Sequence, residues 1–434
     1  MELVVFYFDL RGPFLFVVSA IKNIFVSLYY NDIRMHGREG LKRTTLLLGS
    51  TLTVMAGAII APALPEISRV YEHLPRAELL SKLILTLPAL FIALLGPLAG
   101  YFIDRNGRRK VLLFSLFLYA LAGTTGAYLS NIYLILAGRA FLGMAVGAMM
   151  TAIVTLIGDY YEGKARSTFM GYQAAFSSTG GLVFISTGGF LADYHWRFPF
   201  LIYAVSLIIL FMAWLSVNEP VRQRSLEQIR LPGKAFFRSI PRQVFWVYAL
   251  AFFSFAVFYM IPVQMPFMLS ALEGTTNTQV GIAIATMNIT AMLTAFNYAR
   301  FKKRMKFTSV MALVYALIAA GYIIISQSGT YGLMVTGIMI SGLGFGMQMA
   351  NINLWLVELA PPGIRGTLVG YLNTFIFLGM FASPVLLQPL VSLSSLYTSF
   401  FLVAIILLLT GTLLVYSDRR NAWDVSTSDL GADR

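Results

Sequence analysis

Twelve long apolar stretches, separated by short polar segments, dominate the pattern along this chain. Each has the roughly 17–25 residues that an α-helix needs to cross a bilayer. Inside a bilayer each backbone polar group must be satisfied within its own segment, so each stretch predicts a transmembrane helix. The predicted spans are 44–64, 82–103, 110–129, 133–157, 167–191, 199–217, 244–270, 279–299, 307–326, 331–356, 367–391 and 397–417. The polar stretch 218–243 predicts a cytoplasmic linker between two groups of six helices.

Composition supports a polytopic membrane protein and excludes other classes. Hydrophobic residues make up 58% of the 434 residues and charged residues 12%, against roughly 25% charged in a soluble domain. A soluble enzyme or a disordered chain is therefore excluded. With no Cys and three scattered His, thiol chemistry and a metal cluster are not expected, and without a P-loop neither is ATP drive. We expect no cofactor.

The second half of the chain repeats the first at a shift of 199 residues. Five glycines and three polar residues of the first half coincide with their counterparts: Gly138, Gly143, Gly147, Gly171, Gly180, Asp159, Arg166 and Tyr172 fall on Gly337, Gly342, Gly346, Gly370, Gly379, Glu358, Arg365 and Tyr371. Six spans per unit make both units enter the membrane in the same direction. The pattern predicts two parallel six-helix repeats with a substrate site between them near the midplane.

The distribution of Lys and Arg predicts the orientation. Assigning both termini and the loops before odd-numbered spans to one side leaves Arg69, Arg76, Lys82 and Arg197 on the other, and Arg139 inside a span. The first side then holds 27 of the 32 basic residues. By the positive-inside rule that side is cytoplasmic, which explains the net charge of +13 without nucleic-acid binding.

The predicted domains are a cytoplasmic lead, two six-helix halves, the linker and a cytoplasmic tail. They comprise residues 1–43, 44–217, 244–417, 218–243 and 418–434, respectively. The first 34 residues contain apolar runs too short to cross a membrane. They form an interfacial helix, or translation starts at Met35, and we favour the second reading.

The stretch GPLAGYFIDRNGRRKVLL, residues 96–113, is the most specific motif. Two glycines four residues apart let another helix come close, and an acid stands at the helix end. A further glycine permits the turn, and four basic residues flank this glycine. These are Gly96 and Gly100, Asp104, Gly107, and Arg105, Arg108, Arg109 and Lys110. A turn held inside by positive charge is the simpler alternative. The complete pattern resembles the signature loop of the major facilitator superfamily, and the resemblance covers about 44–417.

The resemblance implies that Asp104 latches the cytoplasmic side shut near the start of the eleventh span. Gly96 and Gly100 would pack on Gly366 and Gly370. In the repeated loop Lys303 stands where Asp104 maps, so the two halves are not equivalent.

Two paired stretches on the cytoplasmic side each hold an acid and, seven residues on, an arginine. The resemblance implies that Asp159 with Arg166, and Glu358 with Arg365, belong to charge networks that change between conformations. Local structural pairing is the alternative.

Arg139 is the one charge well inside a predicted span, and such a charge marks a functional site by default. The stretch GRAFLGMAVG around it resembles the fourth-span motif of the family, which implies a role in proton coupling. No Asp or Glu lies in the middle of a span, so Glu66 at the outer end of the first span is the candidate proton carrier, and an interfacial residue without such a role is the alternative. Phe184 and Ile185 replace the Gly-Pro pair of drug/proton antiporters, which weakens that assignment.

The candidate substrate cavity lies between the halves, where the resemblance implies that spans one, four, seven and ten line it. Spans seven and ten offer polar groups among small and apolar residues: Tyr259, Gln264, Gln348 and Asn351. The alternative is that these polar residues pack between helices and line no cavity. Few fixed charges favour a neutral or lipophilic ligand over an anion.

These patterns predict an all-α, twelve-helix secondary transporter in the bacterial cytoplasmic (inner) membrane, with both termini in the cytoplasm and acting as a monomer. We expect alternating access and proton-coupled efflux of lipophilic or amphipathic small molecules, an antiport that could support multidrug resistance. The alternative is a proton-coupled or facilitative carrier of a small neutral nutrient or metabolite. A membrane enzyme would need a catalytic constellation at membrane depth, and the sequence offers none.

The charge distribution generates a topology prediction. Because the chain has no Cys, single cysteines can be introduced without background. Cysteines placed in 218–243 should react with an impermeant maleimide only after the cytoplasmic side is exposed. Labelling of this segment on intact cells would refute the arrangement of two halves joined inside the cell.

Overall fold

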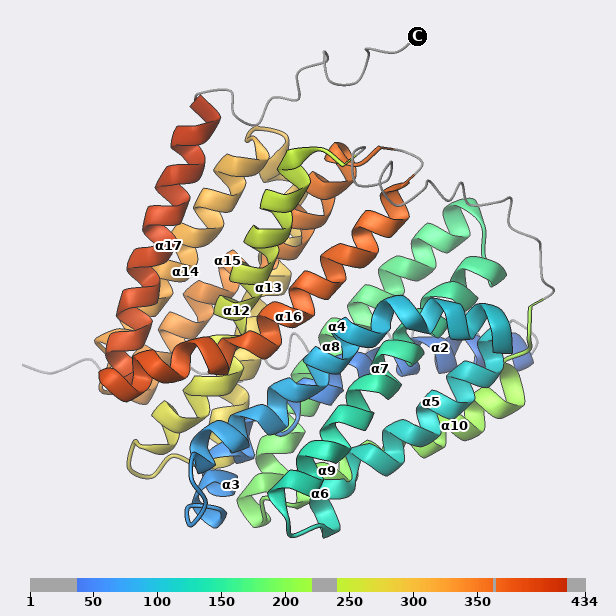
Figure 1. The fold of residues 1–434 in the computed structure, drawn as a ribbon, viewed down its shortest axis with the longest axis horizontal. Coiled ribbons are helices and arrows are strands. Elements are labelled where there is room, and N and C mark those ends of the chain that lie inside the picture. Colours follow the sequence, from blue (N-terminus) through green and yellow to red (C-terminus); the bar gives the residue numbers. More distant parts are fainter. Residues whose placement is uncertain (1–36, 221–239, 362–363, 420–434) are drawn as a thin grey trace, which may run out of the picture.

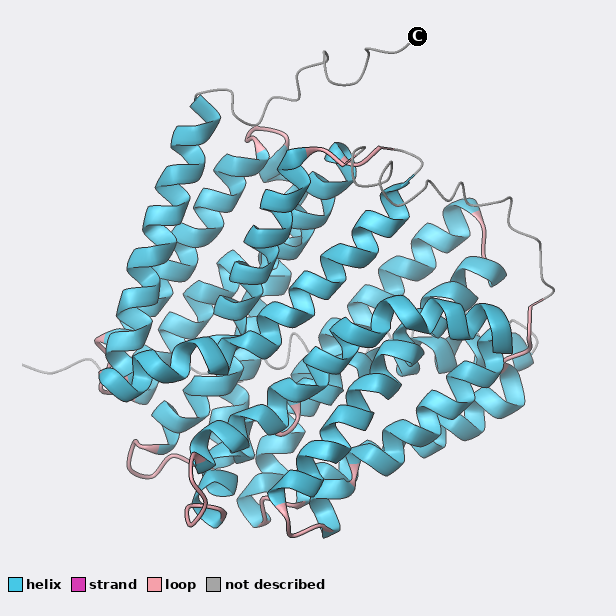
Figure 2. Ribbon diagram, in the orientation of Figure 1, coloured by secondary structure: helices cyan, strands magenta, loops and turns pink. Residues whose placement is uncertain are grey.

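The computed structural model describes residues 37–220, 240–361 and 364–419. These residues form helices joined by short loops, with no strand among them (Figure 2). The lead 1–36, most of the predicted linker and the tail beyond residue 419 lie outside the described residues, so the predictions made for them stay predictions.

The N-terminal half consists of six membrane-length helical segments, three of which are broken into shorter pieces. Its elements are α2 (Gly37–Ala58), η1 (Ala61–Ala63), α3 (Leu64–Val70), α4 (Ala77–Asn106), α5 (Arg108–Gly123), α6 (Thr125–Tyr128), α7 (Ile132–Tyr160), α8 (Gly163–Tyr194), α9 (Phe198–Leu201), η2 (Ile202–Ala204) and α10 (Val205–Ser216). Proline stands in the first turn of η1, α3 and α9, where its missing N–H costs nothing.

The C-terminal half has six unbroken helices: α12 (Arg242–Ser270), α13 (Asn277–Lys302), α14 (Phe307–Ser326), α15 (Tyr331–Leu359), α16 (Arg365–Leu393) and α17 (Leu396–Arg419). Across the described residues of both halves, twelve helical segments are long and apolar enough to cross a membrane. The predicted all-α polytopic fold is confirmed.

The shift of 199 residues found in the sequence also relates the helices. It carries α7, Ile132–Tyr160, onto the bounds of α15, Tyr331–Leu359, and the start of α5 onto the start of α14. The halves are therefore parallel repeats of one six-helix unit.

The two halves pack against each other at one end. We call the face at which α2 begins and α17 ends the terminal face, and the face at which α4 and α13 begin the distal face. Figure 1 shows the halves side by side at the distal face and diverging toward the terminal face. Two pairs of long helices make most of the contact between the halves, α8 with α13 and α4 with α16.

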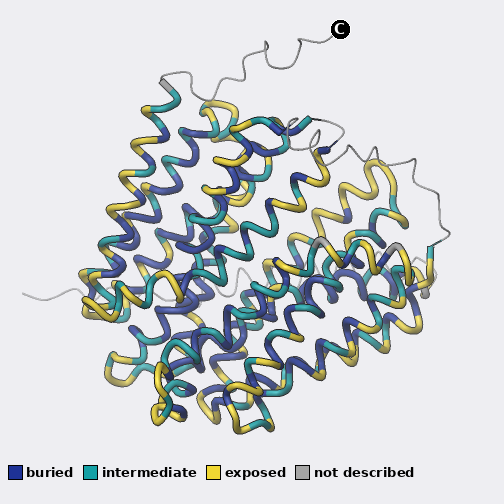
Figure 3. Tube along the Cα trace, viewed as in Figure 1, coloured by how far each residue is buried: buried dark blue, intermediate teal, exposed yellow. Residues whose placement is uncertain are grey.

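The outward sides of the bundle are apolar. Large hydrophobic side chains on α10 and α17 are more than half exposed, among them Phe211, Trp214, Leu409 and Leu413, and Figure 3 shows exposed positions along α17. On a soluble protein such a patch would be a liability, whereas in a bilayer it contacts acyl chains.

Candidate functional site

At the distal face the two halves meet backbone against backbone. A Cβ added at Gly189 of α8 would lie 2.4 Å from the carbonyl oxygen of Asn277 at the start of α13. One added at Gly281 would lie 2.8 Å from the carbonyl oxygen of Ile185. Only glycine permits this approach, so these two residues let α8 and α13 seal the distal face.

Asp193 lies one turn beyond Gly189 and crosses the same interface. Its carboxylate accepts hydrogen bonds from the backbone N–H groups of Asn277, at 2.6 Å, and Thr278, at 3.1 Å. It also accepts one from the Thr278 hydroxyl. Sequence reasoning missed this residue, although Ile185, Gly189 and Asp193 recur at steps of four and so share one helix face.

Lys82 joins the second pair of bridging helices. Its side chain is fully buried and pairs with Glu78 of its own helix. Its Nζ also lies 3.4 Å from Oε1 of Gln388 on α16 and 4.9 Å from the ring centre of Phe267 on α12. From the sequence alone, Lys82 is only a basic residue outside the cytoplasm, because hydropathy places it at the very start of a predicted helix.

The terminal face is open at the corresponding positions. A Cβ added at Gly96, Gly100, Gly366 or Gly370 would meet nothing within 4 Å. The predicted packing of Gly96 and Gly100 on Gly366 and Gly370 is therefore absent from this conformation, because the halves diverge toward this face. The side chain of Asp104 lies outside the described residues, so its latch remains a prediction.

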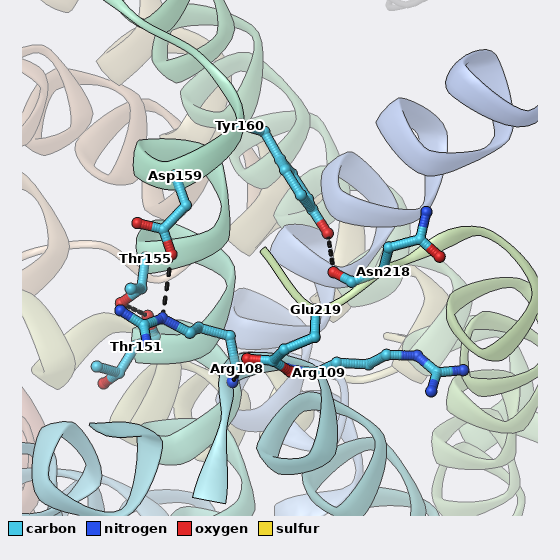
Figure 4. A network of polar contacts seen from close by, with 8 residues as sticks. All are labelled: Arg108, Arg109, Thr151, Thr155, Asp159, Tyr160, Asn218 and Glu219. Carbon is cyan, nitrogen blue, oxygen red and sulfur yellow. Dashed lines mark hydrogen bonds and ion pairs between the residues drawn. The ribbon is translucent and has the colours of Figure 1, made fainter. Parts of the chain in front are cut away.

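A polar network ties α5, α7 and the end of α10 together at the terminal face (Figure 4). The Glu219 carboxylate accepts hydrogen bonds from the backbone N–H groups of Arg108, at 2.7 Å, and Arg109, at 2.9 Å, and so caps α5. Gly107 has φ +92°, and a Cβ there would lie 2.8 Å from Glu219. Gly107 thus forms the turn that the sequence predicts.

The predicted acid–arginine pairs are not ion pairs in this conformation. Asp159 instead faces α5 and pairs with Arg108, whose Nε lies 3.0 Å from Oδ2. The Arg166 guanidinium lies against Gly158.

The second pair is likewise apart. Arg365 donates to the carbonyl oxygen of Ala360, and no ion pair joins it to Glu358 within the described residues. Arg105, the remaining predicted gate residue, is exposed and donates to the Tyr101 hydroxyl, at 3.4 Å.

Arg139 is fully buried in a cage of aromatic and backbone groups. Its Nη2 donates to the carbonyl oxygen of Gly123, the last residue of α5, at 2.8 Å. Its guanidinium carbon lies 4.7 Å and 4.8 Å from the ring centres of Phe200 and Tyr203. The cation thus stabilises the carboxyl end of α5 and two ring faces. Nε and Nη1 have no partner among the described residues.

Glu66 lies apart from Arg139, although the coupling hypothesis expected the two residues to act together. Its carboxylate interacts with His195, Arg69 and Asp193, and the backbone N–H of Trp196 is directed to it. The reason is local: Glu66 lies in the short helix α3 at the distal face, whereas Arg139 points from α7 toward α5 and η2. Among the described residues, therefore, no carboxylate pairs with Arg139 in this conformation.

The four predicted cavity residues have different surroundings. Gln264 and Gln348 are each 1% exposed, and both amide atoms of Gln264 and Oε1 of Gln348 have no partner among the described residues. The Tyr259 hydroxyl would lie 2.6 Å from a Cβ at Gly57, so Tyr259 touches the other half.

Asn351, by contrast, accepts a hydrogen bond from the Tyr298 hydroxyl and donates to the carbonyl oxygen of Phe307. Its polar atoms are used inside the C-terminal half, which makes it a packing residue here rather than a cavity residue.

Twelve membrane-length helices in two parallel repeats, meeting across an interface sealed at one face and open at the other, define a polytopic membrane transporter. The family model of the Major Facilitator Superfamily matches residues 46–384 and 274–430. The chain belongs to this superfamily.

Curated relatives and solved structures agree with this assignment. The chain is 21% identical over 371 residues to the bacillibactin exporter of Bacillus subtilis (strain 168), covering 81% of this chain and 90% of that protein. It is 23% identical over 405 residues to multidrug resistance protein 2 of the same organism, covering 87% and 95%. A D-xylose–proton symporter has the same fold, with a TM-score of 0.70 at 16% identity, covering 86% and 96%.

The Arg139 cage generates a stability prediction. Arg139→Lys keeps the charge but loses the planar fork that reaches Gly123 while contacting both rings. A hydrogen bond from a charged group contributes about 1.5–3 kcal/mol, so the variant should unfold at a lower temperature in detergent. The control Arg105→Lys, at an exposed site, should leave the unfolding temperature unchanged. Equal unfolding temperatures for the Arg139 variant and the parent would refute the cage.

Proposed function

We propose that this transporter is a secondary active exporter working by alternating access. It moves lipophilic or amphipathic small molecules out of the cytoplasm of a bacterial cell, with protons entering in exchange. The observation that carries the proposal is the asymmetry of the interface between the halves. The distal face is sealed by glycine contacts, whereas the glycines of the terminal face meet open space. A carrier in one end state of an alternating cycle has this form.

The basic residues orient the cycle. Among the described residues, the Lys and Arg residues that the sequence assigns to the cytoplasm lie at the terminal face, so we take the conformation described here as inward-facing. Both termini are then cytoplasmic, and the distal face is the outer face.

Closure of the terminal face would bring the predicted gate into contact. α4 and α16 are already in contact. Near the terminal face they carry glycines at which an added Cβ would meet nothing within 4 Å, namely Gly96, Gly100, Gly366 and Gly370. Bringing these ends together would place Asp104 near the start of α16, where a carboxylate is stabilised by the helix dipole. Asp159 with Arg108, and Glu358 near Tyr298, would adjust in the same motion.

The substrate class rests on the uncharged polar side chains at the predicted cavity positions. Both amide atoms of the buried Gln264 and Oε1 of the buried Gln348 lack protein partners among the described residues, and an unpaired buried polar atom is costly until water or a ligand satisfies it. Two amides and Tyr259 among apolar side chains suit a molecule with a few hydrogen-bonding groups on a lipophilic body. The named exporters among the relatives support export over uptake.

Proton coupling is assigned to Glu66, because it is a carboxylate at the distal face near His195 and Asp193. Arg139 would act by holding α5 and Tyr203 in place. One observation favours the alternative, a facilitative or differently coupled carrier of a neutral nutrient: no described carboxylate contacts Arg139.

Transport into proteoliposomes under an imposed pH gradient tests the proposal. The parent should concentrate a lipophilic fluorescent cation when the gradient is present and merely equilibrate it when the gradient is collapsed. Glu66→Gln should abolish accumulation while retaining downhill exchange, because the carrier still cycles but moves no proton. The control Glu72→Gln removes an exposed acid of the same face and should accumulate normally.

Accumulation by Glu66→Gln at the parental level would remove Glu66 from the coupling mechanism. Equilibration of labelled neutral metabolites, with no dye movement under any gradient, would replace export by the nutrient carrier.

A further inference from the structure

The start of α13 is capped from two sources. Its own N-cap residue, Thr276, accepts a hydrogen bond from the backbone N–H of Gln279, at 3.2 Å, and the Gln279 side chain accepts one from the N–H of Thr276, at 3.0 Å. This capping box leaves the N–H groups of Asn277 and Thr278 without a partner in their own helix. Asp193 of the opposite half accepts from both.

Because the start of α13 is capped partly by its own residues and partly by the other half, we propose that Asp193 is the distal latch of the transporter, meaning the residue whose contact keeps the distal face closed. Its carboxylate holds α13 against α8 in the inward-facing conformation and must release α13 before the distal face can open. The inference rests on the proposed alternating-access function and adds the residue that controls its distal gate.

Three features of the contact suit a latch rather than passive packing. The acid and the two N–H groups come from different halves, so the contact exists only when the distal face is closed. A negative charge at a helix N-terminus is stabilised by the helix dipole. When Asp193 moves away, α13 keeps its own capping box, so release of the latch does not unfold the start of this helix.

The same construction is predicted at the other face. Asp193 stands at the end of α8 and faces the start of α13, just as Asp104 stands at the end of α4 and would face the start of α16. A shift of 199 residues replaces Asp193 with Ser392 and Asp104 with Lys303. Both acids therefore belong to the N-terminal half alone, each facing the start of one C-terminal helix. Since the faces close in turn, only one latch is engaged at a time.

Accessibility of a reporter cysteine behind the seal tests the latch without substrate or gradient. Ile185→Cys places the only thiol of the chain on the sealed face of α8, and an impermeant maleimide is applied from the distal side of purified, reconstituted protein. Adding Asp193→Asn to this variant removes the charge while keeping the size of the side chain. The labelling rate should rise about tenfold, which corresponds to a loss of about 1.4 kcal/mol in the stability of the closed distal face. Asp193→Glu should restore part of the protection.

Two further variants make the result decisive. Glu273→Gln, which removes an exposed acid in the same distal loop, should leave the labelling rate unchanged. Gly281→Ala forces a Cβ against the Ile185 carbonyl and should raise labelling by a steric route. If Gly281→Ala raises labelling but Asp193→Asn does not, the latch proposal is wrong. Because the readout is conformational, this failure would leave the transport test of the export proposal unaffected, and absence of export would not alter the labelling result.

Discussion

The close approach of α8 to α13 at the distal face is the contact on which the observed conformation depends. Two glycines bring backbone atoms of different halves together, and this proximity places Asp193 within hydrogen-bonding distance of the start of α13. In a bilayer, helix association gains little from burying apolar surface, because lipid tails are as apolar as the side chains. Backbone packing and a few polar contacts therefore determine which face of the interface is closed.

Features with a strong periodic or repetitive signal could be predicted from the sequence. Twelve apolar stretches, the repeat of 199 residues and the turn at Gly107 follow from elementary constraints: bilayer thickness, duplication and the steric freedom of glycine. The helix bounds of α7 and α15 agree with that repeat residue for residue.

Partnerships between side chains could not be read in the same way. Asp159 and Arg166 recur together in both halves, and the family resemblance implies that they share a charge network, but spacing along the chain does not say which neighbouring helix a side chain faces, and Asp159 pairs with Arg108. Asn351 lies on a polar stripe, yet its partners are Tyr298 and Phe307 of its own half. Sequence patterns do not single out Asp193, because its partners are backbone N–H groups, which every residue except proline has.

Arg139 illustrates how a buried charge can be stabilised without a carboxylate. A helix carboxyl end and two aromatic faces surround it, so its burial by itself does not identify a proton path. Glu66, on the distal face with His195 and Asp193, shares its surroundings with the proposed latch. The coupling residue and the latch that we propose would therefore lie in one region of the molecule, where a change of charge at one carboxylate would affect the other.

Distances between spin labels at the two ends of the α8–α13 pair test alternating access most directly. Cysteines at Tyr194 and Glu273 report on the distal face, and a second pair at Ala165 and Lys303 reports on the terminal face, each measured by double electron–electron resonance in reconstituted protein. As substrate and pH gradient are varied, the distal distance should lengthen whenever the terminal distance shortens. Two distances that stay fixed, or that lengthen together, would contradict the account.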